Sequence, residues 1–111
     1  MKKKKENEYQ SGLINRIKER FPGSMVLKND ARYLQGIPDL TVLYEDKWAA
    51  LEVKREPGAH RQPNQSYYIS KLNRMSYASV IDPDNEQEVL DEMATTFGSR
   101  RKTRVPKSKQ A

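Results

Sequence analysis

Three charged residues lie at the ends of apolar segments where strands would be expected. Asp39 is in "GIPDL" (36–40), directly before the apolar run "LTVLY", and Glu52 and Lys54 are in "WAALEVKR" (48–55). Charged side chains inside strands are disfavoured unless a partner or a function uses them. Two carboxylates in a chain without Cys and with one His suit a hard, oxygen-binding cation such as Mg²⁺ or Mn²⁺. A cation beside a lysine is suited to phosphodiester hydrolysis, because it acidifies a water and the ammonium stabilises developing charge.

The alternation of side chains along a strand decides whether these residues meet. A strand at 47–54 places Ala50, Glu52 and Lys54 on one face and the apolar pair Leu51 and Val53 on the other. Glu52 and Lys54 are therefore expected to point the same way.

The position of Asp39 depends on the turn that joins the two strands. A two-residue turn at Glu45-Asp46 sets Asp39 across from Glu52, and a four-residue loop from Glu45 to Trp48 sets it across from Lys54. Both leave Asp39 on the polar face, whereas an odd loop without a bulge turns it away. The alternative to a site is a surface ion pair of Glu52 with Lys54 or with Arg55.

Patterns of apolar residues predict the elements that would position this site. Tyr9, Leu13, Ile17 and Phe21 recur every fourth residue and predict an amphipathic helix over 6–21, ended by Pro22-Gly23. Strands are predicted at 24–29, 40–44, 47–54 and 77–81, an exposed loop at 56–64, and further helices at 65–75 and 85–97, with Asn85 as the last helix's N-cap. The order α-β-β-β-α-β-α predicts an α/β fold with a mixed sheet flanked by helices.

The distribution of charge divides the chain into three parts. Of 21 basic residues, four are Lys2 to Lys5 and six lie in 98–111, whereas 6–97 holds all 15 acidic residues. We therefore expect a basic N-terminal arm at 1–5, one folded domain at 6–97 and a basic, flexible tail at 98–111. Basic arms usually bind polyanions, most often nucleic acid. The alternative is that they only solubilise the chain.

Composition also excludes several classes of protein. With 111 residues the chain is expected to form one small domain. No apolar run approaches the roughly 20 residues of a membrane span, and no apolar region follows the first lysines as in a secretory signal. Without cysteine, disulfides and thiolate metal sites are excluded. A cytoplasmic protein is expected, in the host cytoplasm if the chain is phage-encoded.

The motif "GIPDL" followed by "ALEVK" resembles the signature of the PD-(D/E)XK nuclease superfamily. More narrowly, "GIPDLTVLY", "LEVKREPG" and the later "NQ" resemble the VRR-NUC family, whose small stand-alone members are similar to Holliday junction resolvases. The resemblance extends over about 8–93 and implies a restriction-endonuclease-like core.

This resemblance also implies roles for individual residues. It implies that Asp39, Glu52 and the carbonyl oxygen of Val53 bind the metal and that Lys54 is catalytic. Gln65 matches a glutamine that the family places near the active site.

The family often adds a metal-binding glutamate from its first helix. Glu8 matches it best because Glu8 precedes Tyr9 and lies beside the apolar stripe, and Glu6 is the rival. The alternative for Glu8 is a solvated glutamate favoured by the helix dipole.

Residues around these motifs are candidates for contact with DNA. Basic side chains are suited to phosphates and an exposed tyrosine is suited to stacking on an opened base. The candidates are Lys28, Arg32, Arg55, His60, Arg61 and Tyr67.

Together these features predict a Mg²⁺-dependent DNA endonuclease, with Mn²⁺ able to substitute. Branched DNA such as a four-way junction is the expected substrate, and a homodimer is expected because paired cuts need two sites related by symmetry. The alternatives are a nicking or homing-type endonuclease on linear duplex and a non-catalytic nucleic-acid-binding module.

Overall fold

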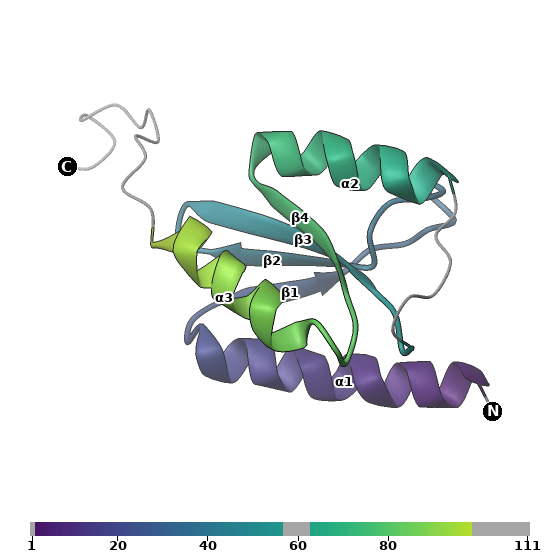
Figure 1. Cartoon of the computed structure of the whole chain (residues 1–111), viewed down its shortest axis with the longest axis horizontal. Coiled ribbons are helices and arrows are strands. Elements are labelled where there is room, and N and C mark those ends of the chain that lie inside the picture. The colour runs from purple at the N-terminus through teal and green to yellow at the C-terminus, as the bar shows by residue number, and fades with distance from the viewer. Residues whose placement is uncertain (1, 57–62, 99–111) are drawn as a thin grey trace.

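A computed structural model describes residues 2–56 and 63–98, with side chains described for 8–56 and 67–98. The elements follow the expected order (Figure 1): α1 (Lys2–Arg20), β1 (Met25–Lys28), β2 (Leu40–Tyr44), β3 (Lys47–Val53), α2 (Pro63–Met75), β4 (Tyr77–Ile81) and α3 (Glu86–Phe97).

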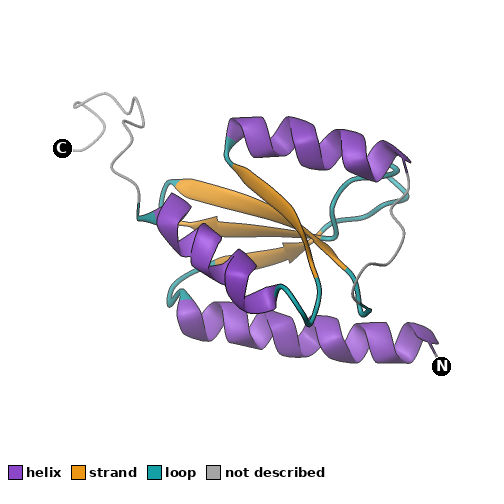
Figure 2. Cartoon of the chain, in the orientation of Figure 1, coloured by secondary structure: helices purple, strands orange, loops and turns teal. Residues whose placement is uncertain are grey.

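The four strands form one mixed sheet in the order β1-β2-β3-β4. The pairs β1–β2 and β2–β3 are antiparallel, and β3–β4 is parallel because α2 carries the chain back between them. Figure 2 shows the sheet between two helical layers, with α1 and α3 on one face and α2 on the other. The predicted α/β class with a mixed sheet flanked by helices is thus confirmed.

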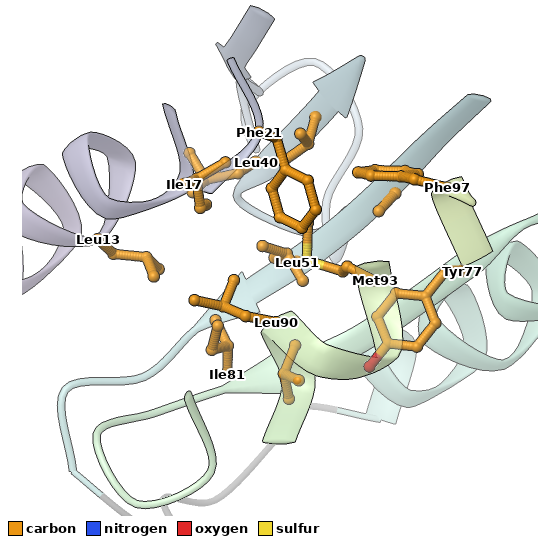
Figure 3. Close-up of a cluster of buried hydrophobic side chains, with 13 residues drawn as sticks. Leu13, Ile17, Phe21, Leu40, Leu51, Tyr77, Ile81, Leu90, Met93 and Phe97 are labelled. Carbon is orange, nitrogen blue, oxygen red and sulfur yellow. The ribbon is translucent and has the colours of Figure 1, made fainter. Parts of the chain in front are cut away.

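The core lies between the sheet and the pair α1 and α3 (Figure 3). Leu13 and Ile17 of α1 and Phe21, which directly follows the helix, are buried, which confirms the predicted apolar stripe. Burying each such side chain stabilises the fold by roughly 1.5–3 kcal/mol. The other members are Leu40, Val42, Ala49, Leu51, Tyr77, Ile81, Val89, Leu90, Met93 and Phe97.

Polar contacts fix α1 against α3 where the two helices leave the core. The Tyr9 hydroxyl donates a hydrogen bond to Glu86 Oε1 at 2.8 Å, and Arg16 Nε lies 2.5 Å from Glu86 Oε2. Burial and the hydrogen bond to Glu86 raise the pKa of Tyr9 above its usual range. The tyrosine therefore remains a neutral donor.

Two helices begin earlier than the sequence predicts. α1 starts at Lys2 and not at Glu6, so the lysines expected to form an arm extend the helix; lysine is a good helix former. α2 starts at Pro63 and not at Gln65, which agrees with the preference of proline for the first helical position.

The residue before α3 does not cap the helix in the way expected. Asn85 occupies the N-cap position but makes no capping hydrogen bond. Its Oδ1 instead accepts a bond from the N–H of Asp82, and its Nδ2 donates to the carbonyl of Val80. The amide side chain is therefore used to close the β4–α3 loop.

The layer formed by α2 covers β3 and β4. On β1 and β2, the register places Met25, Leu27 and Leu43 on this same face of the sheet, and all three stay exposed.

In the part of the chain that the structure describes, no helix combines the length and hydropathy needed to cross a membrane.

Candidate active site

The turn between β2 and β3 sets the register of the site. Tyr44 pairs with Lys47, so the turn is the two-residue alternative, Glu45-Asp46. Glu45 has a positive φ of 57°, as the first central residue of a tight hairpin turn requires. Leu40 of β2 pairs with Leu51 of β3. The next pair in this register sets Asp39 opposite Glu52.

Asp39 is held in place at the start of β2. Its Oδ2 accepts a hydrogen bond of 2.8 Å from the N–H of Val53, and its carbonyl accepts one of 2.8 Å from the N–H of Asn29. The Asn29 side chain also donates to the carbonyl of Pro38, whose own side chain is fully buried. The segment "GIPDL" therefore fixes one carboxylate beside the end of β3.

Glu52 is buried, with 2% of its surface exposed. Burial is the main cause that raises its pKa, to about 7, and repulsion from Asp39 adds to it. The Lys54 ammonium and a hydrogen bond from the Asp39 backbone lower this pKa in part. The carboxyl group therefore changes charge near neutral pH.

β3 ends at Val53, one residue before the predicted end of this strand at Lys54. The N–H of Lys54 donates to the carbonyl of Ile81 at 2.9 Å, which continues the pairing with β4. Its Nζ lies 3.4 Å from Glu52 Oε2, and its side chain is 18% exposed. The Glu52–Lys54 pair is thus largely buried, unlike the surface ion pair considered as the alternative to a site. Arg55 forms its ion pair with Glu56 and not with Glu52.

These groups fit a small divalent cation. Asp39 and Glu52 supply carboxylate oxygens, the preferred ligands of Mg²⁺. In an extended strand the N–H and C=O of one residue point to the same side, so the carbonyl of Val53 faces Asp39 as its N–H does. Within the described side chains, no group of three His, Cys, Asp or Glu residues gathers closely enough to hold a metal. The oxygen donors that this end of the hairpin offers are therefore two carboxylates and one backbone carbonyl.

The predicted helix-borne ligand does not join this set. Glu8 lies on α1 with its side chain exposed, because its neighbour Tyr9 takes the buried direction toward Glu86. Adjacent helical residues project about 100° apart. The rival Glu6 and the predicted Gln65 lie in α1 and α2, and their side chains fall outside the described ones.

The candidate DNA contacts are placed as follows. Lys28 ends β1 and is exposed, on the face of Leu40 and not on that of Glu52. Arg32 is exposed and bound to Asp30, and Tyr67 is exposed on α2 with its ring 5.0 Å from that of Tyr68. His60 and Arg61 lie outside the described residues.

Arg55, which follows Lys54, has one buried nitrogen atom in its guanidinium group. Its Nε is buried and has no hydrogen-bond partner among the described residues. A guanidinium next to Lys54 with an unused donor is compatible with the predicted contact to a phosphate.

Sequence reasoning missed the role of Asn29. Its Nδ2 donates to the carbonyl of Pro38 and to Thr41 Oγ1, both at 2.9 Å, beside its backbone bond to Asp39. It thereby positions the first carboxylate. An asparagine just after an apolar strand is the only available signal, and it is equally typical of an ordinary turn.

Comparison of the chain with family models, curated proteins and solved structures gave no significant match. The functional assignment therefore depends on the site itself and on the motifs that surround it.

The raised pKa of Glu52 predicts how stability depends on pH without metal. Between about pH 4.5 and 7 the folded state keeps a proton on Glu52 that the unfolded chain releases, so the contribution of Glu52 to the free energy of unfolding falls as pH rises and is constant above 7. The loss is of order 3 kcal/mol at 1.36 kcal/mol per pKa unit. Glu52→Gln should remove this loss, as urea unfolding in EDTA at several pH values will measure.

The exposed Glu19→Gln is the control for this experiment, and its stability should follow the wild-type curve. An equal pH slope in wild type and Glu52→Gln would show that the buried carboxyl is not the titrating group.

Proposed function

We propose that this protein is a divalent-metal-dependent endonuclease that hydrolyses DNA phosphodiester bonds, with branched DNA as its substrate class. The observation that carries the proposal is the meeting of Asp39 and Glu52 at one end of the β2–β3 hairpin, with Lys54 Nζ 3.4 Å from Glu52. The resemblance of "GIPDL" and "ALEVK" to the PD-(D/E)XK nucleases supports the same reaction.

Each residue then has a distinct role. Asp39, Glu52 and the carbonyl of Val53 hold the cation, which supplies charge neutralisation and a more acidic water when bound. Lys54 donates from its ammonium to the attacking water or to a phosphate oxygen. Gln65, in the first turn of α2, is proposed to orient the substrate near this site.

The burial of Glu52 favours catalysis over a non-catalytic DNA-binding module. A buried carboxylate next to a second one is destabilising and repels phosphate, so it weakens binding unless a cation is held there. A nicking or homing-type endonuclease on linear duplex uses the same chemistry and differs only in substrate.

We also propose a homodimer, because one site cuts one strand and paired cuts need two sites related by symmetry. Analytical ultracentrifugation at the concentration used for cleavage tests this. A monomer that still makes paired cuts would contradict it.

The function is tested by incubating supercoiled plasmid, linear duplex, a flap and a four-way junction with the protein in Mg²⁺, Mn²⁺ or EDTA. We expect cleavage only with metal, and fastest on the junction. Preferential nicking of duplex would favour the alternative endonuclease, and absence of cleavage on all four substrates would contradict the proposal.

The basic residues of 98–111 should add affinity that does not depend on sequence. Each phosphate they neutralise contributes a slope of about −0.9 in log K against log salt concentration. Deleting 99–111, which removes six basic residues, should flatten this slope and weaken binding while the cleavage rate of bound DNA is unchanged. An unchanged slope would show that the tail does not contact DNA.

A further inference from the structure

Tyr33 is the most exposed large hydrophobic side chain among the described residues, at 88%. It lies in the loop between β1 and β2, which leads to Asp39. A single exposed aromatic residue is common on protein surfaces and needs no explanation by itself. Whether this ring has a function depends on how firmly the loop holds it and on what lies near it.

The part of the loop around Tyr33 is an ordered turn. The N–H of Tyr33 donates to the carbonyl of Asp30 at 3.0 Å, and the N–H of Arg32 donates to Asp30 Oδ1 at 2.8 Å. Further along, the N–H of Ile37 donates to the carbonyl of Leu34 at 3.2 Å. These bonds hold the backbone of Tyr33 while its ring stays in water, so presenting the ring costs little entropy on binding.

The same loop is anchored on the proposed active site. Asn29 closes its base through a backbone bond to Asp39 and side-chain bonds to Pro38 and Thr41. Gly36, with a φ of 91°, allows the chain to turn back toward the site. Tyr33 and Asp39 therefore belong to the same loop, whose two ends are joined by the hydrogen bonds of Asn29.

The distance from Tyr33 to the site is limited by the chain. Asp39 is the sixth residue after Tyr33 in the sequence, so their Cα atoms are at most about 21 Å apart. At a rise of 3.4 Å per nucleotide, this is about six nucleotides of DNA. Figure 1 shows the β1–β2 loop at the end of the sheet where β3 ends and α2 begins.

The residue before Tyr33 in the sequence carries a positive charge. Arg32 precedes Tyr33, and its side chain is 92% exposed although it contacts Asp30. Exposed aromatic and basic side chains on one surface loop are the residue types that proteins use for single-stranded nucleic acid, where a ring stacks on a base and a cation lies near the backbone.

We propose that Tyr33 stacks on an unpaired base within about six nucleotides of the scissile phosphate and thereby selects DNA with an opened strand over continuous duplex. This inference rests on the proposed function for its substrate. In continuous duplex both faces of a base are covered by its neighbours, whereas a branch point or splayed end leaves a face free. Tyr33 is a specificity-determining residue in this account, and it takes no part in the chemistry.

The test compares the affinity of the full chain for splayed DNA and for linear duplex, in EDTA so that no cleavage occurs. Tyr33→Ala should weaken binding to splayed DNA roughly 5- to 150-fold, the range that corresponds to the loss of one stacked base. Binding to linear duplex should be unchanged. Tyr33→Phe should bind like wild type, because stacking needs the ring and not the hydroxyl.

A matched control is Met75→Ala, which removes another exposed apolar side chain at the C-terminal end of α2. It should leave both affinities unchanged. The fluorescence of 2-aminopurine placed within six nucleotides of the branch should change on binding wild type but not Tyr33→Ala.

Several outcomes would overturn the inference. These are an equal loss on both DNAs, no loss on either, a Tyr33→Phe variant as weak as Tyr33→Ala, or a change in oligomeric state with Tyr33→Ala, which would assign the ring to a protein contact. Failure of the proposed function is distinguishable, since it would appear as no cleavage in Mg²⁺ with the preference for splayed DNA retained.

Discussion

Asp39→Asn is expected to abolish cleavage, by at least three orders of magnitude in single-turnover rate, while the protein stays folded and binds DNA. The asparagine oxygen can still accept the hydrogen bond from the N–H of Val53, so the local backbone is kept. The substitution removes a negative charge that raises the pKa of Glu52 and repels phosphate. DNA affinity in EDTA should therefore be equal to or higher than that of wild type.

The measurements are junction cleavage, thermal unfolding and DNA binding on the same preparation. Asp46→Asn is the matched control, because it changes an aspartate at the opposite end of the same hairpin. If Asp39→Asn loses thermal stability and activity in proportion to the unfolded fraction, the residue is structural. If it is stable and cuts at the native rate, it is not a metal ligand.

Lys54→Ala is expected to lower the single-turnover cleavage rate by about two to four orders of magnitude, as removal of one group that acts in the transition state does. A second effect must be separated from this one. The Lys54 ammonium lowers the pKa of Glu52, so its removal raises that pKa further and keeps the carboxyl protonated at neutral pH. Metal affinity will then fall at pH 7 and recover at higher pH.

A pH series separates the two effects. If Lys54 acts on water or phosphate, raising the pH to 9 restores metal binding in Lys54→Ala but not cleavage. Full recovery of cleavage at high pH would show that Lys54 acts only by lowering the pKa of Glu52. Lys47→Ala is the matched control, because Lys47 is at the other end of β3, is 19% exposed and also contacts a neighbouring acid.

Much of the fold could be predicted because its elements carry local signals. The stripe of Leu13, Ile17 and Phe21 has helical spacing, and the strands are short apolar runs bounded by turn residues. The predicted start of α1 was wrong because four consecutive lysines are typical of a basic arm, although lysine extends a helix readily.

The site could be predicted only in part. The alternation of side chains indicated that Glu52 and Lys54 share a face, but the turn that sets Asp39 opposite Glu52 uses a positive φ at Glu45, a residue that gives no signal for it. The burial of Glu52 is a result of tertiary packing at the end of β3, which no local pattern contains. The pKa of Glu52, which follows mainly from that burial, was for the same reason not predictable.

The central claim is that Asp39 and Glu52 together bind one divalent cation. Isothermal titration of the full chain with Mn²⁺ at pH 6 and pH 8 tests it most directly. We expect saturable binding by wild type that releases more protons at pH 6 than at pH 8, because Glu52 must lose its proton to bind the cation. Both Asp39→Asn and Glu52→Gln should lose this binding. Equal Mn²⁺ binding by wild type and both variants, or no binding by wild type at pH 8, would contradict the account.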